Sequence, residues 1–299
     1  MHGETVKRIA RECGFELSGI ARAEPSSDFA RYEQWAAQSM AGEMRYLTDR
    51  RAELRRDPRS LLPTARSILC VGKLYNTDPE AKDPGVSRYA WGSADYHDVV
   101  REGLERMVER LQAIEPFEWK VCVDTAPLLE RSYARLAGLG WIGKNTCLIN
   151  EPQGSWFFLG EILTSLEIEP DTPPPDRCGT CTKCIDACTT EAITPDGIDS
   201  KRCIAYLTIE LRGPIPQELQ AATGHHIFGC DICQEVCPWN SRAPVTEEPA
   251  FAPRDIPPLD ELAQMTEAEF KAFTKGTPLS RPKYEGFQRN VAVARSNRD

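Results

Sequence analysis

The spacing of hydrophobic positions divides the first 168 residues into alternating helices and buried strands. Apolar residues at helical spacing predict three helices, over 4–12, 28–40 and 94–114. Continuous apolar runs predict four strands, over 67–72, 119–124, 145–149 and 156–168. Proline suits the first turn of a helix and glycine its end, so a further helix is expected from about Pro127 to Gly138. Helices and strands mixed in this order predict an α/β (α+β) fold.

Proline-rich stretches mark where this organisation changes. Residues 169–176 contain four prolines and read as a stiff linker, which ends the α/β domain at residue 168. The linker opens a cysteine-rich domain, which we place over 169–245. A second proline-rich stretch leads into a third part over 246–299, where we expect a short helix near 266–274 and a helical, basic tail.

Eight of the twelve cysteines fall in or between two runs whose spacing indicates iron–sulfur chemistry. The first run reads C-x2-C-x2-C-x3-C, the second reads C-x2-C-x3-C-P, and one further cysteine lies between them. Two-cluster bacterial ferredoxins use this spacing, with the last cysteine of each run binding the other cluster. The predicted ligands are Cys178, Cys181, Cys184 and Cys237 for one [4Fe–4S] cluster, and Cys188, Cys203, Cys230 and Cys233 for the other. The spacing therefore predicts a bacterial-ferredoxin-like domain with two [4Fe–4S] clusters.

Two other uses of these cysteines fit the spacing less well. Zinc sites also use C-x2-C pairs, but normally as two separated pairs around one ion. Disulfides are disfavoured because a chain of 299 residues can build a core without them. One departure from ferredoxin runs is Thr189, which follows Cys188 where proline is usual. We expect this threonine to reduce the rigidity of the loop and to leave the cluster in place.

Composition bounds the class of protein. Hydrophobic residues make up 41% of the chain and charged residues 27%, as in ordinary globular proteins. No apolar stretch approaches the roughly 18 residues that a membrane span needs, and the first residues resemble no export signal. We therefore expect a cytoplasmic protein with no membrane partner, in a compartment that keeps its thiols reduced.

The net charge of −9 argues against nucleic acid as the default partner, but the charge is unevenly distributed. Residues 45–66 carry seven arginines against three acids, and residues 281–298 carry five basic residues against one acid. Each segment therefore has a local charge of +4 and is a candidate for phosphate contacts. Helix faces covered with ion pairs would produce the same pattern, and sequence alone favours that interpretation.

A polar, glycine-rich segment between apolar runs is the candidate for chemistry. Asp124 ends a predicted strand at a strand-to-helix turn, a frequent position for ligand contacts, although a helix cap would also place an aspartate there. Gly138, Gly140 and Gly143 follow. These glycines would allow the backbone to approach a large flat ligand, or they would serve only as turn residues.

These motifs, together with several others, resemble those of the epoxyqueuosine reductases, which complete the tRNA base queuosine. The resemblance covers nearly the whole chain. It rests on 93–97 (SADYH), 124–127 (DTAP), 138–145 (GLGWIGKN), 157–161 (FFLGE), 178–188, 203–210 (CIAYLTIE), 229–234 (GCDICQ), 237–240 (CPWN) and 289–295 (RNVAVAR). Agreement in so many separate motifs is specific.

The resemblance implies a cobalamin-dependent reduction of an epoxide at the wobble position of tRNA. Cobalamin is expected between the α/β domain, which is then a cobalamin-binding domain, and the cluster domain, with electrons passing through both clusters to cobalt. By motif match, Asp124 is the proton donor to the epoxide oxygen. We expect burial under the cofactor to raise the pKa of Asp124 and keep it protonated. The implied cofactor contacts are Asp124, Lys144, Asn145, Ser155, Leu159 and Asp231.

The resemblance also implies partners and leaves two rival functions. The partners are tRNA, through its anticodon loop, and an electron donor such as a flavodoxin or ferredoxin; a monomer is expected. His97 lacks the following glycine of the D-x-H-x-x-G pattern, so we do not expect it to bind cobalt. A cobalamin-dependent reductive dehalogenase has the same cofactor plan, but such enzymes usually carry a twin-arginine signal. A ferredoxin-type electron carrier would bind the clusters without cobalamin.

Overall fold

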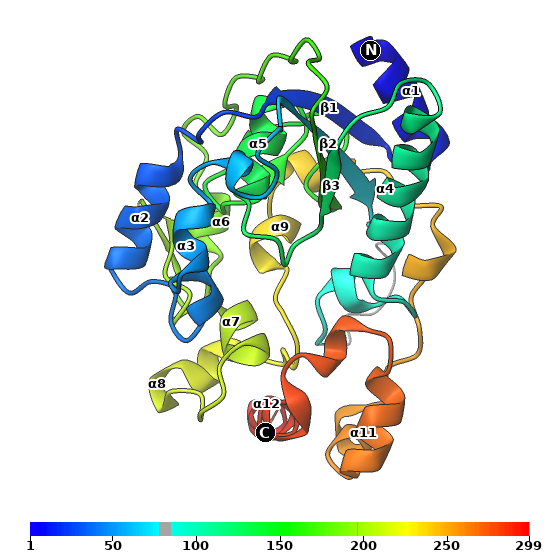
Figure 1. The fold of residues 1–299 in the computed structure, drawn as a ribbon. Coiled ribbons are helices and arrows are strands. Elements are labelled where there is room, and N and C mark those ends of the chain that lie inside the picture. Colours follow the sequence, from blue (N-terminus) through cyan, green and yellow to red (C-terminus); the bar gives the residue numbers. More distant parts are fainter. Residues whose placement is uncertain (78–84, 196, 299) are drawn as a thin grey trace.

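The computed structural model describes residues 1–77, 85–195 and 197–298. Its centre is a four-stranded antiparallel sheet in the order β1-β2-β6-β3 (Figure 1). These strands are β1 (Leu17–Arg22), β2 (Ser67–Leu74), β6 (Phe157–Thr164) and β3 (Trp119–Cys122). In the register of the sheet, Glu161 of β6 lies opposite Cys70 on one side and Cys122 on the other. The end of β3 therefore brings Asp124 close to the centre of β6.

Helices cover both faces of this sheet. Helices α1 (Gly3–Glu12) and α4 (Tyr96–Gln112) pack on one face, where Gly160 of β6 lets the side chains of α4 approach the strand closely. Helix α5 (Glu130–Leu136) packs on the other face. Each face buries its own apolar cluster, so the strands alternate between two cores and β2 is buried along its whole length.

Short elements make up the rest of the chain. They include two further strand pairs, β4 (Trp141–Ile142) with β5 (Leu148–Ile149) and β7 (Ile193–Thr194) with β8 (Gly197–Ile198). The helices are α2 (Phe29–Ala37), α3 (Arg51–Leu54), α6 (Lys183–Asp186), α7 (Ile204–Ile209), α8 (Gln217–Gln220), α9 (Ile232–Glu235), α10 (Leu259–Leu262), α11 (Glu267–Thr274) and α12 (Lys283–Ser296). Single 3₁₀ turns are η1 (Arg45–Leu47), η2 (Pro58–Ser60), η3 (Arg88–Ala90), η4 (Ala221–Thr223), η5 (Pro238–Asn240), η6 (Pro249–Phe251) and η7 (Pro278–Ser280).

The last helices form a core of their own with segments from elsewhere in the chain. Phe287 and Val291 of α12 are fully buried, and they share an apolar cluster with Trp91 and Phe228. Helices α11 and α12 lie at the foot of the molecule, where α12 packs beside α7 and α11 lies on the other side of α12 (Figure 1). The predicted helical tail is therefore present as α12, although it packs into the fold. Among the described residues, no helix is both long enough and apolar enough to cross a membrane.

Most predicted elements are present, with differences at their ends. The helices over 4–12, 28–40 and 94–114 and the strand over 67–72 are confirmed. The predicted strand over 145–149 is reduced to two residues, and β1 was not predicted. The mixed α/β content is confirmed, but the main sheet is wholly antiparallel.

Two predicted boundaries were wrong for a physical reason. The predicted strand over 119–124 ends at Cys122, and the helix expected from Pro127 begins only at Glu130. Residues between them form tight turns, so Asp124 lies in a loop and caps no helix. The linker is also anchored, because the Asp171 carboxylate accepts hydrogen bonds from the Ile20 backbone and from Lys7.

Candidate active site

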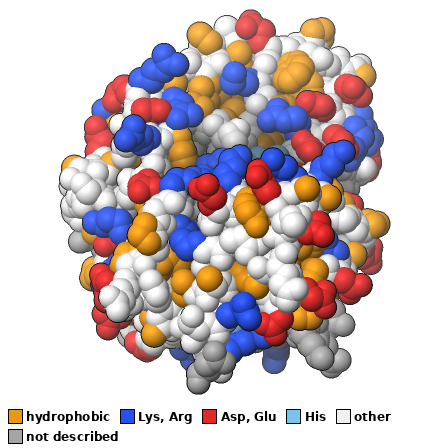
Figure 2. Space-filling view, turned by 90° about the horizontal axis from the view of Figure 1, so that it is seen from below, with side chains coloured by type: hydrophobic (Ala, Val, Ile, Leu, Met, Phe, Trp, Pro, Cys, Tyr) orange, Lys and Arg blue, Asp and Glu red, His pale blue; other side chains and the backbone are white. Residues whose placement is uncertain are grey.

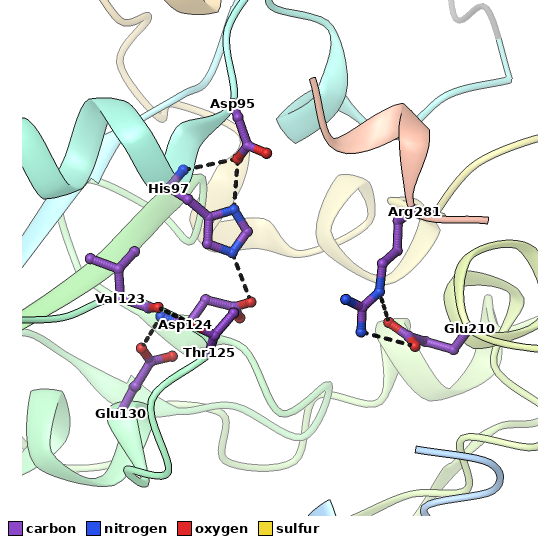
Figure 3. Close-up of polar contacts among 8 residues, drawn as sticks. All are labelled: Asp95, His97, Val123, Asp124, Thr125, Glu130, Glu210 and Arg281. Atoms are coloured by element: carbon purple, nitrogen blue, oxygen red, sulfur yellow. Dashed lines mark hydrogen bonds and ion pairs between the residues drawn. The ribbon is translucent and has the colours of Figure 1, made fainter. Parts of the chain in front are cut away.

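A chain of three side chains, Asp95, His97 and Asp124, forms the centre of the candidate active site (Figure 3). Asp95 caps the N-terminus of α4, because its carboxylate accepts the backbone N–H of His97. The same carboxylate lies 2.6 Å from Nδ1 of the His97 ring. On the other side of the ring, Nε2 lies 3.0 Å from Oδ2 of Asp124. The helix cap therefore orients the imidazole toward the acid that the sequence singled out.

The two aspartates determine where the proton of this group resides. Burial lowers the pKa of His97, but hydrogen bonds to Asp124 and Asp95 outweigh it and raise that pKa to about 9. Burial raises the pKa of Asp124, but the hydrogen bond and charge of His97, and the charge of Arg281, lower it overall. At neutral pH the ring is therefore protonated and Asp124 is ionised. The expected raised pKa of Asp124 was wrong, because His97 supplies a positive charge that the sequence did not reveal.

The backbone of Asp124 adopts an unusual turn. Its φ is +49°, in the left-handed region that aspartate tolerates better than most residues. The N–H of Thr125 donates to the carbonyl of Val123, so the turn closes over three residues with Asp124 at its centre. The N–H of Asp124 donates to Oε1 of Glu130 at 2.6 Å, which ties the turn to the start of α5. The loop therefore presents the Asp124 side chain outward, where it is 55% exposed.

Arg281 and Asp124 lie on opposite sides of a gap, called the recess below (Figure 3), and the charge of Arg281 acts on the Asp124 carboxyl group. Its guanidinium forms an ion pair with Glu210, with 3.1 Å between Nε and Oε1, and stacks over the ring of Tyr46. The face of the molecule seen from below is hollowed near its centre, and Lys and Arg side chains gather along that hollow (Figure 2). An acid–imidazole pair on one side and a cation on the other suit an anionic substrate whose reacting oxygen needs a proton.

The first predicted set of cluster ligands shares one pocket. Its lining includes all four of these thiols, from Cys178, Cys181, Cys184 and Cys237. Among the described residues, no three His, Cys, Asp or Glu side chains surround one point as the ligands of a single metal ion do. A [4Fe–4S] cluster has wider ligand spacing because each thiolate binds a different iron atom.

The second predicted set also lies together. Burial raises the pKa of Cys230 to about 12, and the neighbouring Cys203 and Cys188 contribute to the increase. A hydrogen bond with Cys147 and burial raise the pKa of Cys233, and the neighbouring Cys230 and Cys203 contribute to the increase. Loop segments far apart in sequence thus bring these four thiols into one group. The hydroxyl of Thr189 donates to the Ala222 carbonyl at 2.7 Å, a contact that the usual proline could not make.

Four of the predicted cofactor contacts join the sheet region to the cysteine-rich segment. Lys144 Nζ donates to the carbonyls of Gly179 and Cys181, and Asn145 donates to that of Cys233. The hydroxyl of Ser155 bonds to Gln234 and Asn240.

The fourth contact is Asp231, which is buried. Its carboxylate accepts one hydrogen bond from the Ser87 hydroxyl and another from the Arg88 backbone N–H, the second at 2.7 Å. Burial raises the pKa of Asp231 to about 6. The fifth predicted contact, Leu159, is apolar, lies on β6 and is partly exposed. The polar four therefore hold the two parts of the chain together, and any cofactor contact would be additional to that role.

The glycines of the segment 138–143 pack against the chain itself. A Cβ on Gly140 would lie 2.2 Å from the Ile149 carbonyl, and one on Gly143 would lie 2.5 Å from the Ile149 side chain. Gly138 has a φ of +81° at the end of α5. Turn geometry and internal packing therefore account for all three glycines, and the alternative of a ligand cradle is not needed.

The basic segment over 45–66 keeps only a few of its arginines unpaired. Within it, Arg51, Arg56 and Arg59 pair with nearby acids. The exposed Arg45 and Arg50 have no ion pair within the described part of the chain. The predicted ion-paired interpretation is thus correct for most of the segment, and only a small part of its charge is available to a phosphate.

Sequence reasoning did not assign roles to His97, Glu130, Glu161 or Arg281. His97 and Glu161 did end two of the motifs that carried the resemblance, so a signal was present. Arg281 was considered only as part of a basic tail. Distance from Asp124 along the chain hid His97, Glu161 and Arg281, whereas Glu130 lies only six residues from Asp124 and was missed because the turn between them was not predicted.

Two family models match this chain. Residues 55–125 match "Epoxyqueuosine reductase QueG, DUF1730", and residues 177–240 match the "4Fe-4S double cluster binding domain". The second range contains all eight cysteines of the two groups. The chain therefore contains a double [4Fe–4S] cluster domain.

Curated relatives match nearly the full length. The epoxyqueuosine reductase of Xanthomonas campestris is 45% identical, over 98% of this chain and 86% of the relative. That of Gloeobacter violaceus is 44% identical, over 97% of this chain and 94% of the relative. The Escherichia coli protein of the same name is 38% identical, over 98% of this chain and 80% of the relative.

Solved structures agree with these relatives. Epoxyqueuosine reductase from Bacillus subtilis, with its catalytic aspartate loop swung out of the active site, superposes with a TM-score of 0.89 at 31% identity, covering 98% of this chain and 81% of that one. An epoxyqueuosine reductase bound to a tRNA-Tyr stem loop carrying epoxyqueuosine superposes with the same TM-score and identity, covering 98% and 80%. On this evidence, the chain belongs to the epoxyqueuosine reductase family and is an oxidoreductase.

Proposed function

We propose that this protein reduces epoxyqueuosine to queuosine at the wobble position of tRNA. The observation that carries the proposal is the His97–Asp124 pair, which faces an open recess in a chain of this family (Figure 3). The reaction consumes two electrons and two protons for each epoxide, forms a carbon–carbon double bond and releases the epoxide oxygen as water. An enzyme for this reaction therefore needs a proton donor beside the oxygen and an electron path to the carbon.

The structure supports a proton route that starts on His97. A carbon–oxygen bond breaks more easily when the leaving oxygen is protonated as it departs. The His97 ring carries the proton at neutral pH, and its Nε2–H donates to Asp124. As charge develops on the oxygen, Asp124 passes a proton to it and takes one from His97. Asp95 holds Nδ1–H of the ring throughout, which keeps the imidazole aligned. We thus keep Asp124 as the proton donor and add His97 as its supply.

The two groups of thiols fit the proposed clusters. Trp141 lies in the same apolar cluster as Cys237 and Cys178, and it is almost fully buried. Its indole N–H has no hydrogen-bond partner among the described residues. Sulfur atoms of a cluster accept such donors, so this buried N–H supports a cluster held by Cys178, Cys181, Cys184 and Cys237. By the same spacing, Cys188, Cys203, Cys230 and Cys233 hold the other.

The recess beside Asp124 supports the proposed cobalamin. The Asp124 carboxylate is exposed, and Arg281 lies on the opposite side of the site (Figure 3). Leu159 offers a partly exposed apolar surface on β6. The chemistry that bound cobalamin supplies is a strongly reducing cobalt centre, fed with electrons through the two clusters. In our proposal Asp124, Lys144, Asn145, Ser155, Leu159 and Asp231 would hold it.

We also propose that the loop carrying Asp124 moves as the loop of the Bacillus subtilis relative does. The turn at Asp124 has a positive φ and closes over only three residues, a geometry that costs energy in the folded chain. Its known anchors are the His97 ring and Glu130. A loop held by two hydrogen bonds can leave the site and return with substrate, as active-site loops commonly do.

The proposed partners follow from this reaction. The substrate is tRNA with epoxyqueuosine in its anticodon loop, and the electron donor is a small redox protein such as a flavodoxin or ferredoxin. We propose that the enzyme acts as a monomer and in the cytoplasm, where tRNA is modified. We also propose the division into domains over 1–168, 169–245 and 246–299, although cores that mix residues from these ranges show that the parts pack closely.

Anaerobic reconstitution followed by an assay on tRNA carrying epoxyqueuosine tests the proposal. The expected result is about eight iron atoms and one cobalt per chain, with conversion to queuosine seen by mass spectrometry of nucleosides. Asp124→Asn should lose at least 100-fold in turnover while still binding cobalamin. Asp255→Asn, an exposed aspartate in the C-terminal part, is the matched control.

Three outcomes would contradict the proposal. Full turnover by Asp124→Asn would remove that residue from the chemistry. Iron without bound cobalt, combined with electron transfer to another protein, would favour the electron carrier. Loss of halide from a halogenated phenol, without conversion of tRNA, would favour the dehalogenase.

A further inference from the structure

Glu161 is a buried carboxyl group that the proposed reaction does not use. It lies in the middle of β6, between β2 and β3, with an exposed fraction of 0%. Its register neighbours are Cys70 and Cys122, which offer no charge to balance a carboxylate. Within the described part of the chain, no hydrogen-bond donor reaches either of its oxygens. An ionised group in this position would cost several kcal/mol, so a proton on Glu161 is the stable state.

Within the described residues, Glu130 at the start of α5 is the acceptor that lies within reach of this proton. The two carboxyl groups lie within hydrogen-bonding reach of each other. Helix α5 covers the face of the sheet from which Glu161 projects, and Glu130 is its first residue. The charged groups that act on Glu130 are Asp124, Arg131 and His97. Burial raises the pKa of Glu130 to about 8 and also raises the pKa of Glu161 well above its ordinary value, so the pair retains a proton at neutral pH.

Glu130 in turn holds the backbone of Asp124. Its Oε1 accepts the Asp124 N–H at 2.6 Å, at the centre of the tight turn with positive φ. A glutamate has a long side chain with several rotamers, and freezing it in one orientation costs conformational entropy. A second hydrogen bond to the same carboxyl group offsets that cost. The proton of Glu161 provides such a bond from beneath the loop.

We propose that Glu161 and Glu130 are positioning residues: the buried Glu161 carboxyl donates its proton to Glu130, and Glu130 so oriented fixes the turn that presents Asp124. The inference rests on the proposed function only for the role of Asp124. Neither glutamate touches the substrate. Both act by holding the acid where the departing oxygen will be. A misplacement of the acid by about 1 Å can cost about 100-fold in rate, so precise support has catalytic value.

Two substitutions of Glu161 separate hydrogen bonding from mere packing. In Glu161→Gln the amide still donates to Glu130, so we expect turnover within about twofold of wild type. In Glu161→Leu the donor is lost while the volume is kept, so we expect kcat to fall about tenfold or more with the tRNA KM little changed. Leucine suits the surrounding apolar core, so the thermal unfolding midpoint should not fall. Glu118→Gln, an exposed residue just before β3, is the control.

Two measurements test the inference without any turnover. Infrared spectra at neutral pH should show the C=O stretch of a protonated carboxyl group, weakened in Glu161→Gln and unchanged in Glu118→Gln. Crystal structures should show the Asp124 N–H bonded to Glu130 in wild type and Glu161→Gln, but a displaced loop in Glu161→Leu. These two results would stand even if the enzyme proved inactive on epoxyqueuosine, so failure of the proposed function is distinguishable.

The inference would be overturned by any of three results. The first is a Glu161→Leu protein with wild-type kcat and an undisplaced loop. The second is a Glu161→Gln protein as impaired as Glu161→Leu, since that would assign the effect to packing. The third is the absence of a protonated carboxyl signal from wild type at neutral pH.

Discussion

The charge on a single side chain decides how this site can work. An isolated aspartate at the rim of a recess would be ionised and would have no proton to give near neutral pH. The contact with His97 keeps Asp124 ionised but places a proton on Nε2, an atom 3.0 Å from Oδ2 of Asp124, in a ring with a pKa of about 9. The pair therefore stores a proton for an acid that does not hold one itself. Asp95 and Asp124 share this stabilisation, since both accept from the same ring.

This arrangement predicts a pH dependence that belongs to His97. The protonated ring is the active form, so turnover should be full below about pH 9 and fall as pH rises through about 9. His97→Gln keeps a donor to Asp124 but cannot supply a proton, and kcat should fall by about 100-fold. The variant should also lose the alkaline limb of the single-turnover pH profile. His2→Gln, at the exposed N-terminus, is the matched control. An unchanged alkaline limb in His97→Gln would contradict the assignment.

At the scale of single residues, the cysteine spacing predicted which thiols lie together, but the sequence did not predict the charge of Asp124. The thiols lie in the two groups that the cysteine spacing predicts, although each group combines cysteines of one run with a cysteine of the other. The pKa of Asp124 was predicted in the wrong direction because its partner lies 27 residues earlier. No pattern along the chain reports which helix end will face a given loop.

Between elements, the important contact is the junction of the sheet with the cysteine-rich segment. The Asn240 side chain accepts the backbone N–H of Ser155 at 2.7 Å, just before β6, and donates to the Gln234 carbonyl. Gly154 precedes this contact with a φ of +71°. A Cβ at Gly154 would lie 2.3 Å from Oδ1 of Asn240. The Asn240 amide thus fixes the start of β6 and the end of the second cysteine run, and the glycine at position 154 leaves room for that amide.

Gly154→Ala should therefore loosen the cluster segment. Alanine adds the strain of a left-handed backbone, about 1 kcal/mol, and also displaces the Asn240 amide from its hydrogen bonds, about 1 kcal/mol more. Gly276→Ala is the matched control, because Gly276 has a φ of +69° and nothing within 4 Å of the added carbon.

Chemical denaturation and iron analysis after anaerobic gel filtration would measure both effects. The expected result is a larger loss of unfolding free energy and of iron for Gly154→Ala than for Gly276→Ala. Equal losses in the two variants would show that the junction contributes nothing beyond backbone strain.

The prediction of elements was accurate for a helix with a long apolar period. It was wrong at boundaries next to tight turns. Helix α4 has 17 residues with a clear apolar face, and its prediction over 94–114 was accurate. The helix expected from Pro127 began three residues late, because hydrogen bonds at Val123–Thr125 and Ala126–Leu128 close turns instead. Proline at the first turn is a local preference, and the need to present Asp124 overrode it.

At the scale of the whole molecule, the fold joins two basic segments that the sequence places far apart. Tyr46 of η1 lies under Arg281 from the C-terminal part and beside Arg51 from α3. Arg281 also faces the recess that holds Asp124 (Figure 3). The sequence identified both segments as candidates for phosphate contacts, but their meeting at Tyr46 depends on tertiary packing that no spacing encodes. Their combination at the edge of the recess suits an anticodon stem loop more than either segment alone.

Arg45 and Arg50 should therefore contribute to tRNA affinity more than the other arginines of their segment. Both are exposed and have no ion pair within the described residues, while Arg51, Arg56 and Arg59 are already neutralised by acids. Each alanine substitution that removes a phosphate contact should reduce the slope of log affinity against log salt by about 1. Filter binding of an anticodon stem loop at several salt concentrations would measure it.

Arg8→Ala is the control for this experiment. Arg8 is exposed and pairs with Glu12 on α1, at the far end of the molecule from η1 (Figure 1). We expect its salt slope to match that of wild type, and we expect Arg45→Ala together with Arg50→Ala to lower the slope by about 2. Turnover at saturating tRNA should stay unchanged in the double variant, because neither arginine lies in the Asp95–His97–Asp124 chain. A double variant with the wild-type slope would show that the substrate approaches the recess from another side, with Arg281 as its nearest cation.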